Sequence, residues 1–247
     1  MNTVEFHSID KRMSSNDESF EQFKSFSYEN ELEKARWYHE DLSNGGWREV
    51  KNVQGSTFWL KTFPDNDIPV KVLYKYDLPL SAEQFVDVRN PSNMEILKKY
   101  YKKIYVEIGV LAEDPDGRGY IIYERRDMPW PLNDRDFVLF CPTVKEIEWY
   151  EKRAFIVSYV DTSHPSKPAN EGSCVRATNG GQFIIVIPDE KDPERACTVF
   201  GLADNNLNGW VPTKMEFLYA SAVPKAFDGY FQHLVEGYKV HLSKDNE

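Results

Sequence analysis

A carboxylate and a guanidinium near the middle of the chain have the spacing needed for a buried polar contact. Tyr120, Ile122, Glu124 and Arg126 fall on one side of a strand by two-residue alternation, and the first two are apolar or amphipathic. A carboxylate that points into an apolar interior needs a cationic partner or a proton, and Arg126 lies on the same side. The pattern predicts a polar contact of Glu124 and Arg126 inside a cavity. The alternative is an exposed ion pair at the end of the strand.

The sequence offers little for catalysis. It lacks the GxSxG, GxxxxGK[ST], HExxH and GxGxxG motifs. Cys141 lies in the middle of a predicted strand with no histidine nearby in the sequence, which is typical of a small core residue. We therefore expect no catalytic residue, no metal site and no cofactor. If the chain were an enzyme acting on an apolar substrate, Glu124 would be its general acid or base.

Composition limits the partners. The formal net charge is −10, which disfavours nucleic-acid binding and general adhesion to anionic membranes. The three cysteines form no CxxC pair, and no apolar run approaches the ~20 residues that span a bilayer. The N-terminal segment has no apolar core of a signal peptide. These features predict a cytoplasmic protein that touches membranes only transiently and locally.

The pattern of apolar residues predicts an α+β domain. Residues 16–42 have helical periodicity, 57–63 and 69–77 alternate as strands, and 81–101 form a helix broken at Pro91, with Ser81 and Gln84 as a capping box. Strands follow at about 104–112, 119–126, 136–146, 153–161, 174–188 and 195–204. Because no crossover helices separate them, the sheet should be antiparallel.

The C-terminal part predicts one long amphipathic helix from about residue 212, with Met215 and Leu218 on its apolar stripe. No repeat or linker divides the sequence. We expect a flexible tail over 1–15 and a single domain over 16–247.

Several motifs together resemble the START family of lipid transfer domains. They are IIYERRDMPWPLNDRDFVLF at 121–140, GQFI at 181–184, DNNLNGWVP at 204–212 and AVPKAF at 222–227. Within the family they are most similar to the phosphatidylcholine and ceramide transfer proteins. The resemblance covers about residues 20–240. It implies a helix-grip fold, in which a curved antiparallel sheet wraps around a long C-terminal helix, with N-terminal helices and a lipid cavity between sheet and helix.

The resemblance also implies lipid-contacting positions. Glu124 matches a polar cavity residue, and Cys141 replaces the arginine that pairs with that carboxylate in steroidogenic members. Val157 and Gly201 match polar contacts of the ceramide carrier without their polar groups, which argues against ceramide. Lys98 and Tyr101 lie where the phosphatidylcholine carrier has its Arg-x-x-Trp segment, although a solvated helix face explains them equally well. Trp130 matches a membrane-inserting tryptophan, with Met128 in the same loop; a tryptophan folded over the core is the alternative.

These implications predict a monomeric, non-enzymatic carrier that holds one lipid and moves it between membranes. A phospholipid is favoured, and a sterol or a fatty acid is the second choice. A lipid-gated regulatory protein that binds without transferring is the alternative, followed by an enzyme.

Overall fold

The computed structural model describes residues 18–53, 55–63, 70–94, 105–128, 132–169, 172, 174–209 and 215–244. The N-terminal part forms a 3-10 helix, η1 (Glu18–Phe23), and helix α1 (Tyr28–Asn44). The helix predicted over 16–42 is thus interrupted between these two elements. The tail predicted over 1–15 lies outside the described residues.

Strands and short helices follow in alternation with turns. They are β1 (Arg48–Val53), β2 (Ser56–Thr62), β3 (Val70–Leu78), α2 (Ala82–Arg89), η2 (Pro91–Asn93), β4 (Tyr105–Glu113), β5 (Gly119–Arg126), β6 (Arg135–Pro142), β7 (Lys145–Trp149), β8 (Lys152–Asp161), β9 (Val175–Arg176), β10 (Thr178–Asn179), β11 (Gln182–Pro188), β12 (Cys197–Ala203) and β13 (Asn205–Asn206). Helix α4 (Met215–Lys244) ends the described chain.

The main sheet has the strand order β1-β2-β3-β12-β11-β8-β6-β5-β4. All pairs along this path are antiparallel, as predicted, and the only parallel pair found among the described strands joins the two-residue β9 to β6. Strand β7 pairs with β8, and β10 and β13 form a separate two-stranded sheet. The fold class predicted from the sequence is confirmed: an α+β helix-grip fold.

Two strand predictions were wrong in their extent. Residues 136–146 form two strands, because β6 ends at Pro142 and the chain turns before β7. Residues 174–188 form β9, β10 and β11, since the chain leaves the main sheet after Arg176 and β10 pairs with β13. The predicted break at Pro91 and the Ser81–Gln84 capping box of α2 are both confirmed.

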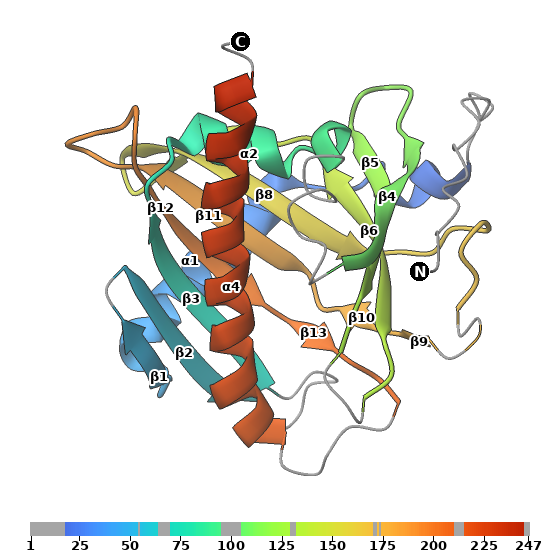
Figure 1. Cartoon of the computed structure of the whole chain (residues 1–247), viewed down its shortest axis with the longest axis horizontal. Coiled ribbons are helices and arrows are strands. Elements are labelled where there is room, and N and C mark those ends of the chain that lie inside the picture. Colours follow the sequence, from blue (N-terminus) through green and yellow to red (C-terminus); the bar gives the residue numbers. More distant parts are fainter. Residues whose placement is uncertain are drawn as a thin grey trace.

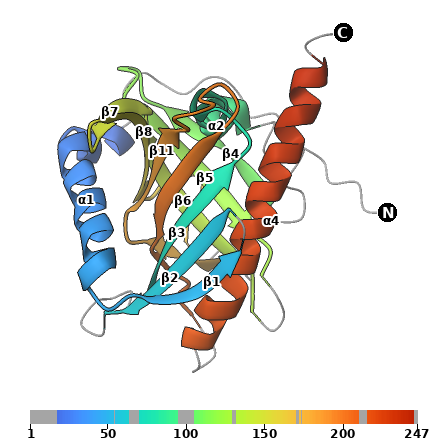
Figure 2. The same cartoon turned by 90° about the vertical axis from the view of Figure 1, so that its left-hand side faces the viewer.

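The sheet lies between helices on its two faces. Figure 2 shows α1 on one side of the strands and α4 on the other. On the outer face, α1 packs through Ala35 and Tyr38 against alternate strand residues such as Leu73 and Ile185. On the inner face, α4 crosses the concave side of the sheet in Figure 1 and packs against β1, β2 and β3. Thus neighbouring residues of one strand serve two different cores, as the two-residue period requires.

Candidate functional site

The inner face of the sheet forms an apolar interior with α2 and α4. Its buried members come from eight strands and the helices, and include Phe58, Val72, Tyr74, Phe85, Ile108, Ile122, Phe137, Leu139, Val157, Ile184, Val186, Val199, Phe231 and Leu234. Helix α4 contributes Phe227 and Phe231, whose rings lie 4.6 Å from those of Tyr74 and Tyr76 respectively. We call this set the inner core. Side chains that carry charge into it are the candidates for specific chemistry.

Glu124 and Arg126 form the ion pair that the strand alternation predicted. The Glu124 side chain is 3% exposed, and the residue lies between Ile108 of β4 and Phe137 of β6 in register. Its Oε2 accepts hydrogen bonds from Arg126 Nη2 at 2.5 Å and from Arg126 Nε at 3.1 Å. The Arg126 guanidinium also lies 4.9 Å above the Phe137 ring. The alternative of an exposed pair is excluded for Glu124, because its carboxylate is buried.

The electrostatics of the pair follow from its surroundings. Burial disfavours a charged Arg126, but the charge of Glu124, the neighbouring Tyr105 and the hydrogen bonds to Glu124 together outweigh that effect and raise the Arg126 pKa. Burial and the Glu124 charge together raise the pKa of Tyr105, which faces Arg126 across β4 and β5. The hydroxyl of Tyr105 therefore stays protonated, and Arg126 stays charged.

A second guanidinium, which the sequence analysis missed, reaches the same region. Arg89 is the last residue of α2. Its Nη1 donates to the Tyr230 hydroxyl of α4 and its Nη2 donates to the Tyr159 hydroxyl of β8. One residue thus ties α2, the sheet and α4 together. No sequence signal showed that Arg89 points inward, because a basic residue in the last turn of a helix is usually solvated.

Three described polar side chains near these charges, two tyrosines and a cysteine, are neutral. Burial raises the pKa of Tyr159 and of Tyr230 more than the charge of Arg89 lowers it. Burial also raises the pKa of the Cys141 thiol, which lies opposite Tyr120 on the inner face. Cys141 is therefore a neutral thiol within the inner core, as its position in a strand indicated.

Val157 and Gly201 lie in one row across the sheet. Val157 of β8 pairs with Ile184 of β11, which pairs with Gly201 of β12, and Gly201 pairs with Tyr74 of β3. A Cβ on Gly201 would lie 2.3 Å from Tyr74 Oη, so the glycine makes room for this phenol. Both predicted positions thus belong to the inner face, and their contact with lipid stays a prediction.

Other predicted residues fall outside what the structure describes. Lys98, Tyr101 and Trp130 lie outside the described residues, as do the side chains of Met215 and Leu218 in α4. Met128 is half-buried and follows the end of β5. Its membrane contact stays a prediction.

The Asp-Arg-Asp motif at the start of β6 holds neighbouring segments in place. Asp134 accepts from Arg125 at 2.8 Å, and Asp136 binds Arg176 of β9 through both carboxylate oxygens at 3.0 and 2.9 Å. The side chain of Arg135, between them, is buried and donates to the carbonyls of Asn133, Leu207 and Asn208. The motif therefore fixes the chain shortly before α4.

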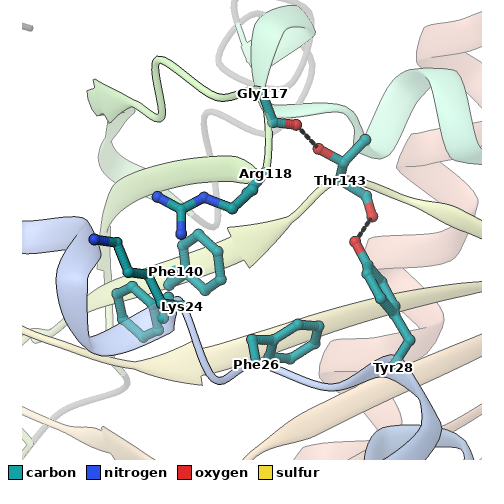
Figure 3. Close-up of a pocket in the computed structure, with 8 residues that line it drawn as sticks. Lys24, Phe26, Tyr28, Gly117, Arg118, Phe140 and Thr143 are labelled. Carbon is teal, nitrogen blue, oxygen red and sulfur yellow. Dashed lines mark hydrogen bonds between the residues drawn. The ribbon is translucent and has the colours of Figure 1, made fainter.

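A pocket lies on the outer side, between the N-terminal segment that includes η1 and the turns that join β4 to β5 and β6 to β7 (Figure 3). It has a volume of about 180 Å³ and is lined by Phe23, Lys24, Phe26, Tyr28, Gly117, Arg118, Phe140 and Thr143. Its two cations are already paired, Lys24 with Glu21 and Arg118 with Asp114. This pocket does not communicate with the charged groups of the inner core, because Phe140 belongs to the opposite face of β6.

Within the described ranges, no group of three or more histidine, cysteine, aspartate and glutamate side chains could hold a metal ion. In the same part of the chain, no helix has the length and apolar character needed to cross a membrane.

Solved structures share the fold. Human STARD10 is 18% identical, with a TM-score of 0.66 over 86% of this chain and 84% of that one. Human StAR-related lipid transfer protein 5 is 14% identical, with a TM-score of 0.67 over 86% and 97% of the two chains. The lipid transfer and protein localization domain of human StarD13 (DLC2) is 15% identical, with a TM-score of 0.60 over 86% and 98%. No curated protein sequence matches the chain.

The family comparison agrees with the fold. The model of the START domain matches residues 94–236, more than half of the sequence. This range contains the Glu124–Arg126 pair, the Asp-Arg-Asp motif and most of α4. The chain belongs to the START domain family, and this membership implies lipid binding or transfer.

Proposed function

We propose that this chain binds one lipid molecule between the inner face of its sheet and α4 and carries it between membranes. The observation that supports this most is the buried Glu124 carboxylate, which lies in register between two residues of the inner core and pairs with the half-buried Arg126. A buried ion pair adds little to stability compared with apolar packing. A site that holds one ligand with a polar and an apolar end needs both kinds of side chain. The ion pair and the aromatic and aliphatic side chains around it provide them.

Enclosure of the lipid is a physical requirement for a carrier. Each methylene removed from water contributes roughly 0.8 kcal/mol of favourable free energy. Moving a two-chain lipid with about 30 methylenes from a bilayer into water would therefore cost about 25 kcal/mol. The carrier must therefore replace the bilayer with an apolar interior. A cavity within the inner core, opened and closed by α4, would do this.

The finer features of the proposal follow the same reasoning. The lipid is a phospholipid, the protein acts as a monomer in the cytoplasm without catalysing a reaction, and its membrane contact is transient. The chain's net charge of −10 argues for a local contact instead of a broad one. The segment beyond Met128, with Trp130, is the proposed contact, since an indole suits the interface between lipid and water.

A vesicle-to-vesicle transfer assay tests the proposal. Donor vesicles contain a fluorescent phospholipid and a quencher, and the chain is added with acceptor vesicles at several protein concentrations. We expect the transfer rate to rise in proportion to protein concentration. A chain that binds lipid but does not accelerate transfer would instead be a lipid-gated regulator, and the carrier proposal would be wrong.

A further inference from the structure

Arg89 brings a positive charge to the inner core and hydrogen-bonds to no carboxylate among the described residues. Among the described residues its hydrogen bonds go only to the hydroxyls of Tyr159 and Tyr230. Its Nε is shielded from solvent and has no hydrogen-bond partner. The guanidinium carbon lies 5.1 Å from the Tyr159 ring and 5.5 Å from the Tyr230 ring, so the aromatic rings flank the cation. The guanidinium therefore retains one donor, Nε, that binds no acceptor among the described residues.

The carboxylate that acts on Arg89 electrostatically already has a hydrogen-bond partner. Glu124 is close enough to influence Arg89 electrostatically, but both of its hydrogen bonds come from Arg126. The described charges of this region are thus two guanidiniums and one carboxylate, a net charge of +2 − 1 = +1. The tyrosines cannot compensate, because burial keeps their hydroxyls protonated.

An unbalanced cation in such a place is costly unless something neutralises it. Two neutral hydroxyls satisfy hydrogen bonds of Arg89 without removing its charge. The flat guanidinium has several donors in a fixed arrangement that suits the oxygens of a phosphate. The Tyr159 hydroxyl accepts from Arg89 and has its own proton to donate to an oxyanion.

We propose that Arg89 and Tyr159 bind the phosphate of a phospholipid head group, with Tyr230 holding the guanidinium from the side of α4. This inference rests on the proposed lipid-binding function and specifies the chemistry of its ligand. A phosphodiester carries one negative charge and balances the net +1 of the region. A diacylglycerol or a sterol has the apolar part without this charge and leaves Arg89 uncompensated.

The inference is tested with two lipids that have the same acyl chains and differ only in the presence of a phosphate. The full chain is incubated with vesicles that contain equal amounts of dioleoyl phosphatidic acid and dioleoylglycerol, then separated from the vesicles. The bound lipids are extracted and their ratio is measured by mass spectrometry. Arg89→Met removes the charge and Arg89→Lys keeps it. Arg153→Met is the matched control, because Arg153 is half-exposed and pairs with Glu83 and Glu146 at the surface.

We expect Arg89→Met to lower the ratio of phosphatidic acid to diacylglycerol at least tenfold. Arg89→Lys should give an intermediate ratio, and Arg153→Met should keep that of the unsubstituted chain. An unchanged ratio in Arg89→Met overturns the inference. If Arg89→Met does not fold, Tyr159→Phe replaces it, with an expected decrease of about threefold; an unchanged ratio there overturns the inference equally.

Two further outcomes separate the sources of failure. If the unsubstituted chain takes up neither lipid, the proposed lipid-binding function fails. If it takes up both, with a ratio that Arg89→Met does not alter, only the role of Arg89 fails. Calorimetric titration with inorganic phosphate and with glycerol 3-phosphate completes the test. Tight binding of either anion in the absence of lipid would identify Arg89 as a site for a soluble phosphate and overturn the assignment to a lipid head group.

Discussion

Replacing Glu124 with glutamine removes the carboxylate from the inner core and leaves the shape of the side chain nearly unchanged. The amide oxygen can still accept one hydrogen bond from Arg126, but the positive charge of Arg126 loses its compensation. Loss of one member of a buried ion pair costs about 3–5 kcal/mol. Because the Arg126 side chain is 31% exposed, water can solvate part of its charge. We therefore expect Glu124→Gln to lower the free energy of unfolding by about 2 kcal/mol.

Equilibrium unfolding in urea measures this change, with the melting temperature as a second readout. For a chain of this size about 2 kcal/mol corresponds to a decrease of roughly 4–8 °C. Glu146→Gln is the matched control, since Glu146 pairs with Arg153 at the surface, where their side chains are 57% and 50% exposed. The loss of this pair should lower the free energy of unfolding by less than about 1 kcal/mol. Equal costs for the two variants would refute the reasoning, because they would show that burial of the Glu124 pair has no energetic consequence.

Three further predictions, two substitutions and one labelling experiment, test other parts of the structure. Gly201→Ala should destabilise the fold by about 1–3 kcal/mol, because the added methyl group collides with Tyr74. Gly109→Ala is the control and should not destabilise the fold, because its Cβ would meet nothing within 4 Å. Urea unfolding that finds Gly109→Ala as destabilising as Gly201→Ala would contradict this. Arg135→Met should lower the free energy of unfolding by about 2–4 kcal/mol, since three carbonyls lose their hydrogen-bond donor. Amide hydrogen exchange should become faster in residues 205–209, and unchanged exchange there would contradict this. Burial raises the pKa of the Cys197 thiol to about 12, so its labelling by a thiol reagent should stay slow from pH 7 to pH 9 and become fast only on unfolding; rapid labelling of the folded chain at pH 8 would be incompatible with it.

Local patterns were sufficient where neighbouring residues determine the structure. The capping box of Ser81 and Gln84 predicted the start of α2, and the alternation of Tyr120, Ile122, Glu124 and Arg126 predicted both β5 and the side on which the ion pair lies. These features depend on residues two to four positions apart. The sequence therefore contains all the information that they need.

Features that depend on distant residues were not predicted. Strand β1 was missed because Arg48–Val53 is largely polar and lies at the edge of the sheet, where β2 is its one partner among the described strands. The inward direction of Arg89 was missed for a similar reason. Its partners, Tyr159 and Tyr230, are 70 and 141 residues away, and only the assembled sheet and α4 bring them to the end of α2.

The central claim is that the inner core encloses one lipid, and native mass spectrometry tests it most directly. The purified chain is incubated with liposomes of mixed phospholipid, sterol and fatty acid, separated from them and sprayed under non-denaturing conditions. The account predicts a complex with the mass of the chain plus one phospholipid. A spectrum that contains the unliganded chain alone, after the same incubation, would contradict it.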